Sequence, residues 1–171
     1  MKNLIIRLIL VICIYLLTHF SGQINYSDII ITVILFFGLF LTYRENREES
    51  LLNTLSNYFF WLTTSVLILL FKNEDIFNIR NIFLTIFLLK LVGVILTYTK
   101  FKKIEVTNTI LTKVWIFSLS IYLIELILNS THGTKNLFLY LGIVSSIEII
   151  FILIRLKKWK FKVKSIFTLK D

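Results

Sequence analysis

The sequence predicts an all-α integral membrane bundle of six transmembrane helices, with both ends of the chain in the cytoplasm. Apolar residues make up 57 % of the 171 residues and charged residues only 17 %, whereas soluble domains average about 45–50 % and about 25 %. The mean hydropathy is +0.83. The chain has no proline and one cysteine, which excludes proline kinks and an intrachain disulfide.

Six apolar runs can each form a helix that crosses the membrane, which takes roughly 17–25 residues. Short polar connectors separate the runs, so we expect a single transmembrane domain. We expect the first run to be retained as a span, because no small-residue cleavage pattern follows it. The predicted spans are residues 4–20, 27–43, 54–71, 79–99, 111–128 and 137–154, and a basic cytoplasmic tail follows at 155–171.

The distribution of lysine and arginine predicts the orientation, because basic residues accumulate in cytoplasmic loops. One side of the predicted membrane has only Lys72, Arg80 and Lys135. The other side has fifteen: Lys2, Arg7, Arg44, Arg47, Lys100, Lys102, Lys103, Lys113, Arg155, Lys157, Lys158, Lys160, Lys162, Lys164 and Lys170. This distribution places both ends of the chain in the cytoplasm. We expect the net charge of +9 to face the anionic lipids of the inner leaflet rather than nucleic acid.

The tail alternates basic and apolar residues from Leu156 to Val163. This alternation favours an extended or irregular segment at the membrane surface over an amphipathic helix. Trp159 and Phe161 are residue types that suit the interface between lipid and water.

Lys90 is the main candidate for a functional residue, because a charge at bilayer depth is costly and marks functional sites. It shares one helical face with Gly93, Thr97 and Lys100. Its backbone lies about 15 Å from the inner boundary, at 1.5 Å per residue. At this depth the ammonium needs a partner or a hydrated cavity.

Two acids lie at comparable depths, Glu125 in the fifth span and Glu148 in the sixth. One interpretation is a buried structural ion pair with Lys90. The other is a pocket for an anionic head group, in which Lys90 supplies the charge.

Known catalytic motifs are missing from the sequence. It contains no nucleotide-binding loop, HExxH, CxxC or GxSxG. His19 and His132 are not at metal-ligand spacing. We therefore predict no catalytic residue, no metal ligand and no cofactor.

Three short features follow one another in the second half of the chain. The basic residue inside span four, Lys90, is followed by an aliphatic stretch and a basic connector, Lys100–Lys103. Asn108-Thr109 and Thr112-Lys113 come next, and then Glu148 precedes Lys164-Ser165-Ile166-Phe167. In these features the chain resembles the CDP-alcohol phosphatidyltransferase family. That family has a His-Thr pair where this chain has Asn108-Thr109 and an Asn-Lys pair where it has Thr112-Lys113, and its acid and terminal segment are separated by a fixed interval.

The resemblance implies a dimer of six-span subunits in a bacterial cytoplasmic (inner) membrane. Such a dimer moves a phosphatidyl group from a CDP-linked lipid to an alcohol, with divalent cations such as Mg²⁺. The first half departs from this pattern. Ser56 and Phe60 stand in place of the last two catalytic aspartates, and Leu52 in place of the motif glycine. Leu35–Leu39 contains no aspartate, and Arg44 lies one position from the motif arginine.

We therefore expect a member that has lost catalysis and that binds lipid head groups, or that pairs with itself or with an active relative. Its expected ligand-binding residues are Lys90, Lys113, Glu148 and Glu125. One alternative is an active transferase with an atypical metal site. Another is a small transporter or immunity-type membrane protein, organised by the lysine and the two acids.

Overall fold

The computed structural model describes residues 2–20, 26–44, 51–72, 76–103, 107–130, 133–160 and 163–168, excepting the side chains of 2, 51–55, 72, 76–84 and 168. The described residues form an all-α fold, as predicted. The long helices are α1 (Lys2–His19), α2 (Ser27–Arg44), α3 (Leu51–Lys72), α4 (Ile76–Phe101), α5 (Ile110–Ile127) and α6 (Thr134–Arg155). A short 3-10 helix, η1 (Ile166–Thr168), follows in the tail. The ends of the long helices differ from the predicted spans by at most three residues.

Three described helices, α2, α5 and α6, are long and apolar enough to cross a membrane. The described parts of α1 (Asn3–His19) and α3 (Ser56–Phe71) are shorter apolar helices. Helices suit a bilayer because every backbone hydrogen bond is made within the segment. Exposed aromatic side chains such as Phe36 and Phe40 on α2 provide the apolar surface that lipid contacts require. By length and composition, three of the six predicted spans are thus able to cross a membrane.

The chain divides into two compact units. Unit 1 comprises Met1–Ile76 and Ser120–His132, and unit 2 comprises Phe77–Leu119 and Gly133–Asp171. The first part of α5 therefore belongs to unit 2 and its second part to unit 1.

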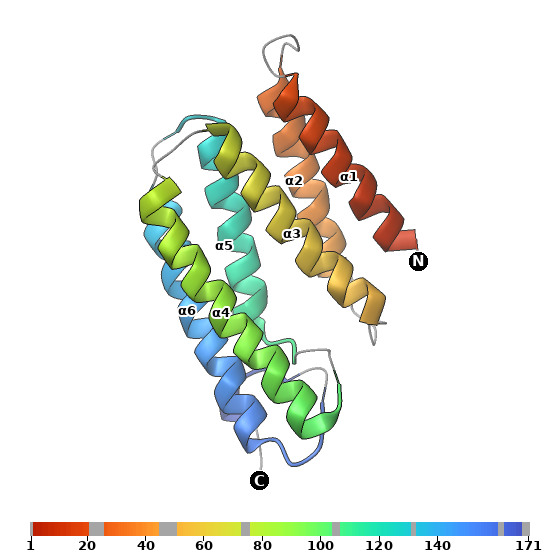
Figure 1. Ribbon diagram of the computed structural model, residues 1–171, viewed down its shortest axis with the longest axis vertical. Coiled ribbons are helices and arrows are strands. Elements are labelled where there is room, and N and C mark those ends of the chain that lie inside the picture. Colours follow the sequence, from red (N-terminus) through yellow and green to blue (C-terminus); the bar gives the residue numbers. More distant parts are fainter. Residues whose placement is uncertain are drawn as a thin grey trace. The chain divides into compact units, whose positions relative to one another are not determined.

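In unit 1, α1 packs against α2 and α3 (Figure 1). The ring of Phe60 on α3 lies where a side chain at Gly38 of α2 would stand, 2.5 Å from an ideal Cβ. Phe60 and Leu35 are fully buried. The missing side chain at Gly38 thus lets α2 and α3 approach closely, as small residues do in membrane helices.

Polar side chains also join the helices of unit 1. Arg7 on α1 is 1 % exposed and donates a hydrogen bond from Nη1 to Ser56 Oγ, at 2.9 Å. Thr42 Oγ1 on α2 lies 2.9 Å from Asn57 Oδ1 and accepts a hydrogen bond from Trp61 Nε1, at 3.2 Å. These bonds satisfy polar groups that lipid cannot satisfy.

In unit 2, α4 and α6 lie side by side (Figure 1). Two apolar clusters join the elements of this unit. One contains Ile149 and Leu153 of α6 with Val94, Leu96 and Phe101 of α4. The other contains Ile152, Leu156 and Val163 with Phe101 and Ile166. The second cluster brings the tail back against the ends of α4 and α6.

The helix ends of unit 2 have identifiable local causes. Lys102 follows α4 with a φ of 56°, a left-handed conformation that often terminates helices. Its N–H donates to Tyr98 O at 2.9 Å. At the start of α5, Thr109 Oγ1 accepts a hydrogen bond from the Thr112 N–H at 3.1 Å, which is an N-cap.

We predict that Phe60→Ala lowers the free energy of unfolding by about 3–5 kcal/mol, because it opens a cavity beside Gly38. The neighbouring Phe59 is 52 % exposed, so Phe59→Ala should change this free energy by about 0.5 kcal/mol or less. Denaturant titration of the protein in detergent micelles measures both values. Equal losses for the two variants would contradict the packing described for unit 1.

Candidate functional site

Lys90 points into unit 2. It shares its face of α4 with Ile86, which is 3 % exposed, and with Thr97, which is fully buried. Gly93 is buried on the same face, and its carbonyl accepts a hydrogen bond from Thr97 Oγ1 at 2.8 Å. The predicted common face of Lys90, Gly93 and Thr97 is therefore the packed face of the helix.

An aromatic ring and a hydroxyl group contact the Lys90 ammonium. Its Nζ lies 4.3 Å from the ring centroid of Trp115 on α5. It also donates a long hydrogen bond, 3.4 Å, to Ser145 Oγ on α6. A cation over an indole face gains about 0.5–2 kcal/mol, most where water is excluded. The contacts therefore stabilise the charge of Lys90 with groups from two other helices.

Gly142 makes room for this arrangement. An ideal Cβ at Gly142 would lie 2.7 Å from Ile86 Cδ1 and 2.8 Å from Trp115 Nε1. Ser145 Oγ donates to the Gly142 carbonyl at 3.1 Å, which orients the hydroxyl that Lys90 contacts. The indole N–H of Trp115 is buried and has no hydrogen-bond partner among the described residues.

Glu148 lies one turn after Ser145 on α6, but the structure does not pair it with Lys90. Its Oε1 accepts a long hydrogen bond, 3.4 Å, from the backbone N–H of Ile166 in the tail. Its Oε2 is buried without a hydrogen-bond partner among the described residues. Glu148 thus connects α6 to the tail, and the Lys90 contacts within unit 2 are those with Trp115 and Ser145.

The two remaining predicted site residues lie on α5. Lys113 is in the part of α5 that belongs to unit 2, and Glu125 is in the part that belongs to unit 1. Both are half-buried. Of the four predicted residues, unit 2 therefore contains Lys90, Lys113 and Glu148. Their role in ligand binding stays a prediction.

Lys100, the fourth residue of the predicted face, contacts the end of α6. Its Nζ donates to the carbonyls of Leu153 at 2.9 Å and Ile154 at 2.7 Å. The last carbonyls of a helix have no partner within the helix and carry partial negative charge. A lysine from α4 therefore satisfies the C-terminal end of α6.

The described part of the tail pairs with the segment that leads into α5. The Val163 N–H donates to Asn108 O at 3.3 Å, and the Ile110 N–H donates to Lys164 O at 3.2 Å. Thr107 Oγ1 donates to Lys160 O at 3.3 Å. We call this pairing of 107–110 with Lys160, Val163 and Lys164 the clasp. Outside η1 the described tail residues are irregular, as their sequence alternation predicts.

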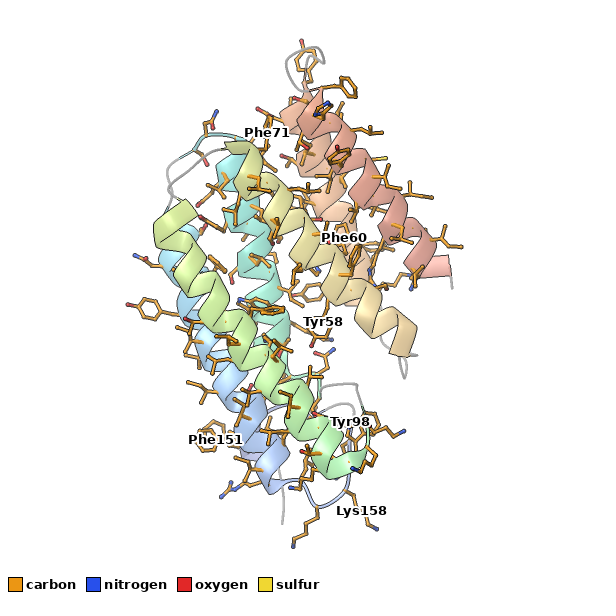
Figure 2. All side chains as sticks on the ribbon, viewed as in Figure 1. Tyr58, Phe60, Phe71, Tyr98, Phe151 and Lys158 are labelled. Atoms are coloured by element: carbon orange, nitrogen blue, oxygen red, sulfur yellow. The ribbon has the colours of Figure 1, made fainter. Side chains whose placement is uncertain are left out.

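Six lysines around the clasp are exposed: Lys102, Lys103, Lys157, Lys158, Lys160 and Lys164. Figure 2 shows Tyr98 and Lys158 at the end of unit 2 where α4 and α6 end. Lys103 lies over the ring of Trp159, with Nζ 5.2 Å from its centroid, and Lys102 lies 5.5 Å from the ring of Tyr98. Basic and aromatic side chains thus alternate on this surface.

Sequence reasoning missed two partners that the structure reveals. Trp115 was not associated with Lys90, although an aromatic residue near the end of a span is a possible cation partner. The sequence predicts no contact for Arg7, which is buried beside Ser56. The position of Arg7 within an apolar run was the sequence signal that could have indicated its burial. Among the described residues, no group of three or more His, Cys, Asp or Glu could hold a metal ion.

We predict that a double-mutant cycle of Lys90→Met and Trp115→Leu gives a coupling energy of about 0.5–2 kcal/mol, because each change removes the same contact. The matched cycle of Lys102→Met and Tyr98→Leu, at an exposed pair, should give a smaller coupling. Unfolding free energies in micelles supply both values. A coupling near zero at Lys90 and Trp115 would contradict the assigned contact.

We also predict that Gly142→Ala destabilises the protein by about 1–3 kcal/mol, because the added methyl group overpacks the contact between Ile86 and Trp115. Gly133→Ala is the control, since nothing lies within 4 Å of an ideal Cβ there. The measurement is the same denaturant titration. If both variants are as stable as the parent protein, Gly142 is not a close-packing position.

Comparison of the chain with protein-family models, with curated proteins and with solved structures finds no match.

Proposed function

We propose that the chain is a six-span protein of the bacterial cytoplasmic membrane that binds phospholipid head groups and transfers no phosphatidyl group. It would have the architecture of the CDP-alcohol phosphatidyltransferases without their metal site. The observation that carries this proposal is the contact between α2 and α3 in unit 1.

At this contact, apolar and cationic groups occupy the positions that the resemblance assigns to metal ligands. Phe60 and Leu35 are fully buried, and the Phe60 ring fills the space beside Gly38. The Ser56 hydroxyl accepts a hydrogen bond from the Arg7 guanidinium. Hard divalent cations need clustered carboxylate oxygens, and a buried arginine would repel them. These residues do not fit a two-cation site.

The proposed six spans have support from helix length. The helices α1, α3 and α4 contain 18, 22 and 26 residues, which lies within or close to the roughly 17–25 residues that a span needs. The bias of lysine and arginine to one side of the predicted membrane supports cytoplasmic ends.

Binding of phospholipid head groups has its support in unit 2. Exposed lysines surround the clasp, directly after α6, which is one of the apolar helices long enough to span a membrane. Lysines that follow a membrane-spanning helix directly attract anionic head groups, by about 1 kcal/mol each.

The experiment is a transferase assay on the purified protein in micelles. CDP-diacylglycerol, Mg²⁺ or Mn²⁺ and a small set of acceptor alcohols (glycerol 3-phosphate, serine, inositol) are supplied together. We expect release of CMP at the level of the protein-free background, with an active transferase as the positive control.

Release of CMP that depends on the divalent cation would establish the alternative, an active enzyme with an atypical metal site. The binding part of the proposal is checked separately, by native mass spectrometry of the protein in detergent. Phospholipid should remain bound to it, and complete absence of bound phospholipid would contradict this part.

A further inference from the structure

Two basic segments that lie far apart in the sequence share one end of unit 2. Lys102 and Lys103 directly follow α4, and Lys157, Lys158, Lys160 and Lys164 follow α6. Among the described residues 100–103, 107–113, 155–160 and 163–168, no side chain is acidic. The surface therefore carries positive charge that no neighbouring carboxylate in these segments neutralises.

The clasp gives these lysines a defined arrangement. Three hydrogen bonds join the tail to residues 107–110. Val163, at 5 % exposure, and Leu156, at 4 %, anchor the tail in the apolar cluster beside Phe101. Glu148 adds a hydrogen bond from the side of α6. A charged tail tied down in this way presents its charges at fixed spacing, whereas a loose basic tail would not.

The depth of this surface follows from α6. Thr134–Arg155 is long and apolar enough to cross a membrane, and Lys157 comes two residues after it. The lysines therefore lie at the level of the lipid head groups. Half-buried Trp159, beside Lys103, is the residue type that occupies this level. A lipid fits this location better than a nucleic acid or a soluble acidic protein does.

We propose that the clasp and its six exposed lysines form one docking surface for phospholipids whose head groups carry two or more negative charges. The proposal rests on the lipid-binding part of the proposed function and names its site and its preferred ligand class. A head group with two phosphates contacts more than one lysine at once, and each basic residue near the surface adds about 1 kcal/mol of attraction. A zwitterionic head group gains nothing comparable.

The test titrates the full chain, delipidated in detergent, with three phospholipids and counts bound lipid by native mass spectrometry. The probes are cardiolipin, phosphatidylglycerol and phosphatidylcholine. We expect cardiolipin to bind most tightly and phosphatidylcholine least. Lys157→Gln/Lys158→Gln should weaken cardiolipin binding about tenfold or more, because it removes two of the six charges.

Two controls separate this surface from general charge attraction. Lys135→Gln removes a lysine near the start of α6, at its other end, and should leave cardiolipin binding unchanged. Val163→Ser keeps every charge but weakens the apolar anchor of the tail, and it should reduce the preference for cardiolipin over phosphatidylglycerol. Val144→Ser is the matched control, at a position 52 % exposed on α6. It should leave the preference for cardiolipin over phosphatidylglycerol unchanged.

The outcomes are distinct. Loss of binding in the double lysine variant together with loss of preference in Val163→Ser supports the proposal. Unchanged preference in Val163→Ser, or equal weakening by Lys135→Gln, overturns it in favour of unordered charge attraction. Co-purifying nucleic acid or acidic protein in place of lipid also overturns it. If the parent protein binds none of the three phospholipids, the lipid-binding part of the proposed function fails as well.

Discussion

A positive charge on the packed face of an apolar helix must be stabilised by its immediate surroundings, and this requirement organises unit 2. A packed helix face offers little water to an ammonium group, and a buried charge is costly unless it has partners, so the contacts must come from neighbouring helices. The structure meets the requirement with the Trp115 ring and the Ser145 hydroxyl. These contacts need close approach of α4, α5 and α6, and Gly142 permits it. One charged side chain of α4 thus contacts residues of two other helices.

Both units use glycine and a large aromatic residue at a close helix contact. Gly38 faces Phe60 in unit 1, and Gly142 faces Trp115 in unit 2. Lipid tails are as apolar as leucine, so helices in a membrane gain stability mainly from close packing and polar contacts. The pairing of a missing side chain with a bulky ring provides the packing. Buried hydroxyl groups, such as Ser56 and Ser145, provide the polar contacts.

The positions of the helices could be predicted because helix formation in apolar surroundings depends on local composition. Six apolar runs without proline between polar connectors were enough to place every long helix within three residues. The irregular tail was also predictable, since its alternation of basic and apolar residues has no helical period. Both features depend on residues that are neighbours in the sequence.

The candidate site was less predictable because its contacts join distant residues. The common face of Lys90, Gly93 and Thr97 followed from spacing alone. The choice of Trp115 over an acid depends on how α4, α5 and α6 pack, which spacing does not encode. The burial of Arg7 and the pairing of Val163 with Asn108 likewise depend on contacts between segments that are far apart in the chain.

The division of α5 between the two units has a consequence for biosynthesis. Unit 1 contains α1, α2 and α3 together with Ser120–His132, so its last segment leaves the ribosome only after all of α4 has been made. Unit 2 in turn needs α6 and the tail. Neither unit can finish folding as a separate early intermediate, and the first three helices remain incompletely packed until Ser120–His132 has been made.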